Sequence, residues 1–595
     1  MDGAGGNEPE PRPKDPKEPG LWFRVSTRVR AAGYWLREKL QAGGRTAVKG
    51  SEGFGDFWQQ RSLWERIGLG AAAALLFLFL VVRIFPVPGV PCQVSVKECP
   101  PEEQSFELVP ADALMYAHLT LDEGSDQYER SGEAFERLAD LRTILSAELP
   151  GALPTPSGAT VDISQDVLPW AERDLALTLM PGRGKSSLPA FVAGIGDRQG
   201  AEEFLTKLAP SAEPRNVNVG DVSMSVYSKG FAAAIVDDSL VFGQEPAVRA
   251  IINAAAGEVP ALQDSPEQEA VRDELPESRF AELYLSRSGV QRLLAGRAGS
   301  ATQLETFVDY GATEGVAAAA VAEDDGIEIV LVSALNEELL AKNPSFFSEL
   351  PEFEPKLTDE AGPRSIAYVG VGEVGPTLTE LLAQAGGSGL GGSLEGLSNS
   401  LRREAGVDPL SELLPALGGQ AALVAEPTDG GPFASLIVDG VDEDQAAQAL
   451  ARLQRPLLRA LGTGGRQVPR FEETEVEGVP VRSVQASPTV NLSYAVFDDK
   501  LVVSTDPAGI AQVRGDGGLE GAKPFERATD ELPDEVSALV FINLDELFGQ
   551  VTRTDLVEDP FFANLSVLFE NATSVALAVN GDDEQIRSEL FLALD

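Results

Sequence analysis

The 595-residue sequence predicts an α+β fold: tandem duplicated lobes with largely antiparallel sheets packed by helices, plus one N-terminal transmembrane helix. Three observations support this prediction. One apolar run stands where the charge of the chain changes sign. Short β-rich segments alternate with helical segments after that run, and the same segments return in the same order later in the chain.

The first 66 residues are basic and fall into two parts. Residues 1–20 are rich in Pro, Gly and charge, which predicts a disordered cytoplasmic tail. Residues 21–66 form a juxtamembrane segment whose apolar side chains recur at helical spacing: Trp22, Val25, Val29, Ala32, Leu36 and Leu40. We expect a basic amphipathic helix on an anionic lipid surface. The alternative is a solvated helix that packs on a partner.

Residues 67–85 form the apolar run and predict a transmembrane helix. At 1.5 Å per residue the run spans roughly 28 Å, close to the ~30 Å hydrocarbon core of a bilayer. Residues 1–66 carry 12 basic and 9 acidic side chains, whereas residues 67–595 carry 35 and 84. The positive-inside rule then places the N-terminus in the cytoplasm and the chain after about residue 86 outside a single-pass cell-membrane anchor. A buried core helix is the alternative, but neither an amphipathic stripe nor a polar face interrupts the run. A cleaved signal peptide would begin closer to the N-terminus.

Residues 86–104 form a proline-rich neck that contains Cys92 and Cys99. Both cysteines would lie in an oxidising compartment, so a structural disulfide is favoured. A bridge across so small a loop contributes roughly 2.5 kcal/mol in the chain-entropy description. A metal pair lacks partner ligands, and a redox pair lacks the C-x-x-C spacing.

The remaining chain repeats itself. DDSLVFGQEPA at 237–247 matches DDKLVVSTDPA at 498–508, and DELPE at 273–277 matches DELPD at 530–534. FVAGIGDRQGAEEFL at 191–205 matches LIVDGVDEDQAAQAL at 436–450. We therefore predict a first ectodomain copy at 105–348 and a second at 349–595. Two similar lobes are expected, and an exchange of end strands between them stays open.

Local patterns predict the elements inside each copy. Alternation predicts strands at 222–228, 231–237 and 239–243, with a tight turn at Asp237-Asp238. Helical spacing predicts helices at 201–208, 247–255, 378–385 and 444–461. Each copy ends in two strands about an acidic turn, at 317–335 and at 574–594.

The search for catalytic and binding chemistry is mostly negative. A net charge of −46 argues against a nucleic-acid partner, and one His and two Cys leave little material for zinc sites or His-based catalysis. His118 lies in an apparent strand, where a packed or surface residue is the expected role. The glycines from Gly194 to Gly200 imitate a dinucleotide-binding loop. The matching segment of the second copy, Asp439-Gly440-Val441-Asp442, keeps only the acidic residue at the start of the helix. A tight turn followed by a helix N-cap therefore explains the segment in both copies. Ser388 and Ser393 lack the spacing and the His of a serine nucleophile.

Carboxylates are too many for any pair to be singled out. Glu323-Asp324-Asp325 and Asp582-Asp583-Glu584 occupy matched hairpin turns, which indicates solvated turn residues. Asx-rich turns invite weak Ca²⁺ binding, yet no twelve-residue EF-hand spacing occurs. We predict no catalytic residue, no cofactor-binding residue, no metal ligand and no cofactor.

Three segments together resemble a known family: LVPADALMYAHLTLD at 108–122, AFVAGIGDRQGAEEFLTKL at 190–208 and VDDSLVFGQEPAVRAI at 236–251. With a membrane anchor before them, they are similar to the bacterial family called domain of unknown function 3352, over about residues 105–595. The resemblance implies an envelope protein with no assigned activity. The preference for Arg over Lys, with abundant Ala and Gly, is typical of a GC-rich bacterial genome.

Three function hypotheses follow. The leading one is a non-catalytic, membrane-anchored envelope protein whose duplicated extracytoplasmic region binds or organises another envelope component. The second is a carrier or sensor for an apolar, lipid-like ligand. An Asp/Glu-based hydrolase is the third. Expected partners are membrane lipid, at the anchor helix and the basic segment, and an unknown envelope protein or apolar ligand.

Overall fold

The computed structural model describes residues 103–137, 163–184, 186–208, 214–294, 312–341, 350–375, 377, 413–428, 431–461, 470–487, 490–515, 517–552 and 571–595. All of them belong to one compact unit, residues 98–595. The segments predicted at 1–20, 21–66 and 67–85, most of the neck, and both Cys92 and Cys99 lie outside these ranges, so those predictions stay predictions. None of the helices in the described ranges is long and apolar enough to cross a membrane.

The first half of the described chain, residues 103–341, contributes ten strands to an antiparallel sheet. They are β1 (Met115–Leu121), β2 (Ala171–Pro181), β3 (Ser187–Ile195), β4 (Arg215–Val219), β5 (Val222–Val226), β6 (Phe231–Val236), β7 (Ser239–Gln244), β8 (Ala281–Ser286), β9 (Thr313–Glu323) and β10 (Gly326–Leu335).

The second half, residues 350–595, contributes ten more. They are β11 (Ala367–Val371), β12 (Ala421–Glu426), β13 (Phe433–Val438), β14 (Glu472–Val476), β15 (Val479–Ser487), β16 (Val490–Phe497), β17 (Lys500–Ser504), β18 (Ala538–Asn543), β19 (Ala572–Gly581) and β20 (Gln585–Leu594).

The two halves have the same strand order. The first half runs β4-β5-β6-β7-β3-β2-β1-β8-β9-β10. The sheet continues as β20-β19-β18-β11-β12-β13-β17-β16-β15-β14, which is the first order reversed with each label raised by ten. The prediction of an α+β fold with a large antiparallel sheet is confirmed. One sheet of twenty described strands runs through both halves, in place of a separate sheet for each lobe.

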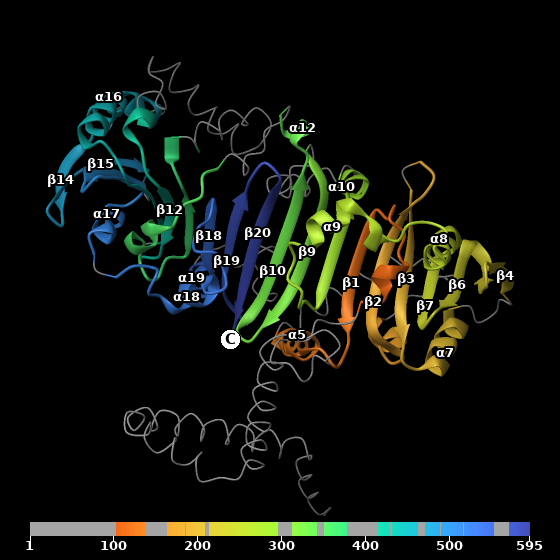
Figure 1. The fold of residues 1–595 in the computed structure, drawn as a ribbon. Coiled ribbons are helices and arrows are strands. Elements are labelled where there is room, and N and C mark those ends of the chain that lie inside the picture. The colour runs from red at the N-terminus through yellow and green to blue at the C-terminus, as the bar shows by residue number, and fades with distance from the viewer. Residues whose placement is uncertain are drawn as a thin grey trace, which may run out of the picture. The chain divides into compact units, whose positions relative to one another are not determined.

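The halves join edge to edge at β10 and β20, which lie side by side in Figure 1. The pairing runs from Gly326 opposite Ala593 to Ala334 opposite Gln585. Ile327 matches Ile586 in the sequence repeat, and in the same alignment Val330 matches Glu589. Val330 and Glu589 are also directly opposite each other. Each half therefore offers the same strand to the other, with a local two-fold relation about this residue pair.

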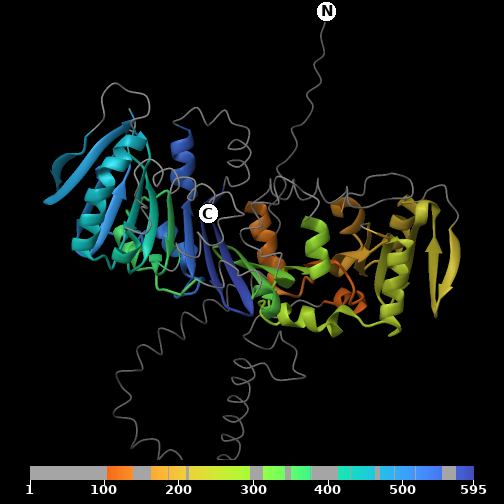
Figure 2. The same ribbon diagram turned by 90° about the horizontal axis from the view of Figure 1, so that it is seen from above.

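Helices cover both faces of the sheet (Figure 2). On β3, Val192 packs in one core with Ile251, whereas its neighbour Phe191 packs in another with Phe204. Side chains alternate across a strand, so the helices that carry Ile251 and Phe204 lie on opposite faces.

The described helices of the first half are α4 (Ser105–Leu108), α5 (Asp126–Arg137), α7 (Arg198–Leu208), α8 (Glu245–Ala255), α9 (Pro266–Arg272), α10 (Arg287–Leu294) and α12 (Glu337–Leu340). Those of the second half are α16 (Glu443–Leu461), α17 (Ala508–Val513), α18 (Lys523–Thr529) and α19 (Leu544–Val551).

Short helical turns connect these elements. A π-helical turn spans Ile163–Val167, and 3-10 turns span Ser228–Gly230, Leu262–Asp264, Lys356–Glu360 and Leu414–Ala416.

The local predictions inside the described ranges are confirmed. Strands β5, β6 and β7 fall within or beside the predicted segments, and Asp237 has φ 52°, as Asp498 has φ 49° at the matching turn. Both acidic helix starts are caps, since the backbone N–H of Gln199 donates to Asp197 and that of Gln445 donates to Asp442. The helix predicted at 378–385 lies outside the described residues.

A candidate functional site in the first half

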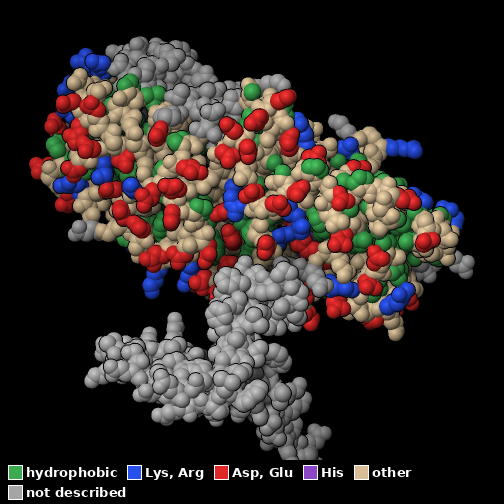
Figure 3. All heavy atoms as spheres, in the orientation of Figure 1, with side chains coloured by type: hydrophobic (Ala, Val, Ile, Leu, Met, Phe, Trp, Pro, Cys, Tyr) green, Lys and Arg blue, Asp and Glu red, His purple; other side chains and the backbone are tan. Residues whose placement is uncertain are grey.

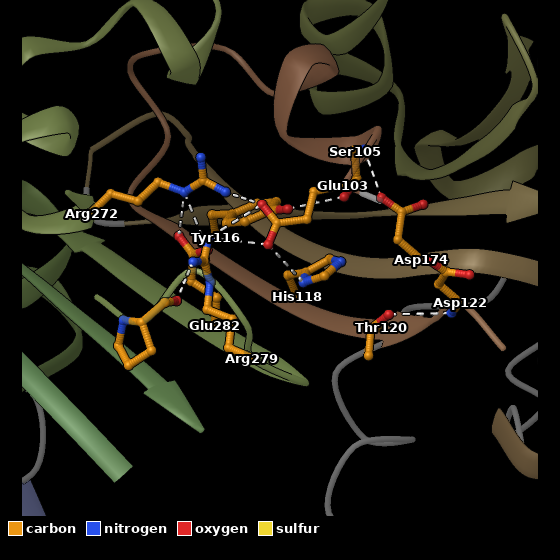
Figure 4. A network of polar contacts seen from close by, with 11 residues as sticks. Glu103, Ser105, Tyr116, His118, Thr120, Asp122, Asp174, Arg272, Arg279 and Glu282 are labelled. Carbon is orange, nitrogen blue, oxygen red and sulfur yellow. Dashed lines mark hydrogen bonds and ion pairs between the residues drawn. The ribbon is translucent and has the colours of Figure 1, made fainter. Parts of the chain in front are cut away.

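Polar side chains gather on one face of β1 and of the strands beside it (Figure 4). Alternation places Tyr116, His118 and Thr120 on the same side of β1. His118 is directly opposite Glu282 of β8, and Thr120 is directly opposite Asp174 of β2. Opposite residues point the same way in an antiparallel pair, so all five side chains share one face of the sheet.

Two glutamates and two arginines form a charge-balanced ion quartet over this face. Arg279 lies 2.6 Å from Glu282 and 3.1 Å from Glu103. Arg272, at the end of α9, lies 3.2 Å from Glu282 and also pairs with Glu103. The side chain of Glu282 has no exposed surface and that of Arg279 is 6% exposed. The burial of four charges is offset only because each of them meets two opposite charges.

The quartet and its neighbours hold the start of the described chain on the sheet. The backbone N–H of Ser105 donates to Asp174 Oδ2 at 2.7 Å, and the Ser105 hydroxyl shares a hydrogen bond of 3.0 Å with the Tyr116 hydroxyl. Burial raises the pKa of Asp174, although the hydrogen bonds from Ser105 oppose the rise. Burial also raises the pKa of Tyr116 well above its usual value, with Glu282 adding to the rise.

His118, the single histidine, is packed in this cluster. Its ring stacks on Tyr116 with centroids 6.2 Å apart, and its Nδ1 lies 4.0 Å from Glu103 Oε1. Within the described residues neither ring nitrogen has a hydrogen-bond partner. Burial, followed by the charge of Arg279, lowers the pKa of His118 to about 3. The imidazole is therefore neutral near pH 7 and far from the pKa that suits a general base there.

The second half has the same fold without this cluster. Tyr116 pairs with Tyr284 across β1 and β8, and Tyr368 pairs with Phe541 across β11 and β18, which makes Tyr368 the counterpart of Tyr116. By the same registers Gly370 stands for His118 and Leu539 for Glu282. A Cβ atom at Gly370 would lie 2.7 Å from the Tyr368 hydroxyl, so a side chain at this position would require the Tyr368 ring to move.

The ion quartet is thus replaced by other residues in the second half. The DELPE and DELPD match puts Val536 at the position of Arg279 and Thr529 at that of Arg272. Val536 and Leu539 belong to a buried apolar core. Because the same strand order forms with an apolar core, the fold does not require the quartet, which marks the cluster as the candidate functional site of the first half.

Gly194, Gly200 and Glu323, which the sequence also singled out, make packing or ion-pair contacts. A Cβ atom at Gly194 would lie 2.2 Å from the Glu172 carbonyl oxygen, and one at Gly200 would lie 2.7 Å from Trp170 Cβ. These glycines permit close approach of neighbouring chain segments. Glu323 lies at the β9–β10 turn and pairs with Arg130 at 3.4 Å. Ser388 and Ser393 lie outside the described residues.

Sequence reasoning singled out His118 but missed Glu103, Arg272, Arg279 and Glu282. The sequence did carry a signal for this position. When the chain is aligned on the DELPE and DELPD segments, Glu282 of the first copy falls on Leu539 of the second. Within the described residues no group of three or more His, Cys, Asp or Glu side chains is placed to hold a metal ion.

Fold and site together define an α+β protein whose antiparallel sheet has the same strand order in both halves and carries a buried ion quartet in one of them. Residues 69–594 match the family described as "Protein of unknown function (DUF3352)", and the chain belongs to that family. No protein with a curated description matches it.

Solved structures give only slight likeness. Crystal form I of TP0453 has a TM-score of 0.24 and 10% identity, covering 40% of this chain and 80% of that one. Crystal form III of TP0453 has a TM-score of 0.23 and 9% identity, covering 40% and 86%. Likeness at this level carries no argument.

Proposed function

We propose that this chain is a non-catalytic protein of the cell envelope, held by a single membrane helix at 67–85, whose extracytoplasmic part binds another envelope component. Its two copies, 105–348 and 349–595, are inferred to be duplicates of one unit. The matched strand orders and the two-fold pairing of β10 with β20 support the duplication.

One observation carries the binding proposal: a row of exposed apolar side chains on three adjacent strands. Val369 on β11 is directly opposite Leu423 on β12, which is directly opposite Leu436 on β13. Their exposed fractions are 36%, 52% and 40%. We call these three residues the apolar row. Exposed apolar side chains that lie side by side, unlike isolated ones, are a feature of interaction surfaces.

The polar chemistry of the described residues supports a binding role over an enzymatic one. His118 is neutral and enclosed. The buried carboxylates Asp174 and Glu426 accept backbone N–H groups, from Ser105 and from Gly362, and so act as structural acceptors. None of these three side chains is therefore placed to act as a catalytic acid or base.

The test is capture of partners by the full-length protein in its native membrane. Leu423→Glu puts a charge in the middle of the apolar row and should abolish recovery of the bound component. Leu283→Glu is the matched control, because Leu283 is an exposed leucine, at 36%, on β8 of the first half. Equal recovery with Leu423→Glu and the unaltered chain would contradict the proposal. If Leu423→Glu instead removes a stoichiometric lipid, detected by native mass spectrometry, and no protein partner, the carrier of an apolar ligand is favoured.

A further inference from the structure

A second surface lies where α4, the end of α8 and the start of α9 meet. Two open hollows of about 660 and 390 Å³ share Glu107 and Gln263 in their lining. We call the two together the acidic groove. It lies beside the ion quartet, since Glu103 and Arg272 line the smaller hollow.

Acidic side chains dominate both hollows. The larger is lined by Glu107, Asp237, Glu258 and Asp264, and the smaller adds Glu269 and Asp273. Arg272 is the one basic residue among those lining either hollow, and Glu103 and Glu282 already pair with it. The groove therefore offers carboxylates to a cationic ligand.

Apolar surface lies between these carboxylates. Leu108 and Pro260 line the larger hollow together with Val259, whose side chain is 38% exposed. The aliphatic stem of a lysine or arginine covers such a surface while its charged end reaches a carboxylate.

Gln268 gives an independent indication of a ligand. It lines the smaller hollow and is only 2% exposed, yet within the described residues its Nε2 has no hydrogen-bond partner. A buried amide donor without an acceptor is costly, and a carbonyl oxygen would satisfy it. Neither a metal ion nor a polyamine carries such an acceptor, whereas every residue of a peptide does.

We propose that the acidic groove binds a basic peptide segment of another protein, with lysine or arginine side chains on its carboxylates and a main-chain carbonyl on Gln268. The proposal does not depend on the apolar row, which is formed by strands of the second half. Either surface can fail its test while the other stands.

The first experiment measures binding of a fluorescent lysine–alanine nonapeptide to the full-length protein in a neutral detergent at low salt. The triple variant Glu107→Gln, Glu258→Gln, Glu269→Gln should weaken binding by about tenfold or more. A matched triple variant, Glu472→Gln, Glu473→Gln, Glu475→Gln, removes the same charge from exposed positions on β14 and should change binding less than about twofold. The control is essential because acidic side chains are spread over the whole face seen in Figure 3. Equal weakening by both triple variants, or no binding at all, would overturn the proposal.

The second experiment separates a peptide from a simple cation. Gln268→Leu should weaken binding of the peptide several-fold and leave binding of spermine, a polyamine without an acceptor, unchanged. An equal effect of Gln268→Leu on both probes, or on neither, would contradict the role given to the main-chain carbonyl.

Discussion

At the scale of single residues, burial lowers the pKa of His118 so far that the ring does not change its charge near neutral pH. Its folded-state pKa of about 3 lies below the ordinary value of 6.5. A histidine with a lowered pKa stabilises the fold above its unfolded pKa, and this contribution is lost as the pH falls from 6.5 toward 3.

The chain has one histidine, so a single imidazole signal reports on it. We expect that signal to show no titration between pH 5 and pH 8 in nuclear magnetic resonance spectra of the folded protein. His118→Gln supplies the assignment, and it should leave partner capture unchanged. A midpoint between pH 6 and pH 7 would show that the ring is solvated and that the packing described for it is wrong.

Glu328 is the most perturbed carboxylate at the junction of the two halves. Burial, then the charges of Glu589 and Glu323, raises its pKa to about 7, against the opposing charge of Arg587. Glu531 also faces it and adds to the rise. In the sequence repeat Glu328 matches Arg587, and Arg587 bonds both Glu589 and the Glu274 carbonyl. At the Arg587 position the charge contacts are therefore attractive, whereas at the matching Glu328 position the neighbouring carboxylates of Glu589 and Glu323 repel the charged form.

A raised carboxyl pKa makes the fold less stable as the pH rises. Between about 4.5 and 7 the folded state binds more protons at Glu328 than the unfolded state, so stability falls across this window. Glu328→Gln should raise the thermal midpoint at pH 8 and reduce the difference between pH 5.5 and pH 8. The effect is on the order of 1 kcal/mol, because the group is partly solvated. Glu475→Gln, on an exposed strand, is the control and should change neither.

At the scale of elements, the hairpins could be predicted and the junction could not. The β6–β7 and β16–β17 hairpins carry an acidic turn between alternating strands, and that local signal is the same in both halves. The outer edge of β10 has no such signal, because alternation does not specify which strand pairs with an edge. The order of the elements therefore implied two lobes, whereas the structure joins them in one sheet.

The ion quartet was hidden for a different reason. Arg272, Arg279 and Glu282 are close in the sequence, but Glu103 is 169 residues before Arg272. Charges in a strand are usually read as solvent-facing, and only the second copy, with Leu539 in place of Glu282, reveals that this position is internal. Contacts so distant in sequence are set by tertiary packing.

The quartet should behave as a unit. Glu282→Leu alone leaves Arg272 and Arg279 short of a partner and should cost about 3–5 kcal/mol of unfolding free energy. The combined change Glu103→Gln, Arg272→Thr, Arg279→Val, Glu282→Leu approaches the second-half composition and should cost less than the single change. Denaturant unfolding of the two variants decides the matter. A cost of the combined change equal to or larger than that of Glu282→Leu alone would refute the comparison between the halves.

At the scale of the whole molecule, the acidic surplus sets the response to salt. The chain carries a net charge of −46, and repulsion among its carboxylates opposes the compact state. Salt screens this repulsion over a Debye length of ~10 Å at 0.1 M. The thermal midpoint of the full-length protein should rise between low salt and about 1 M sodium chloride, and a flat or falling midpoint would show that self-repulsion is not the dominant charge effect.

The proposed binding of an envelope component requires both halves to lie outside the cytoplasmic membrane. The charge switch at residues 67–85 predicts that everything after about residue 86 is outside the cytoplasmic membrane. Protease added to intact spheroplasts, followed by detection of both ends of the chain, measures this directly. The account predicts loss of the part beyond residue 86 and survival of the N-terminal 60 residues. Protection of the C-terminal part until the membrane is broken would contradict it.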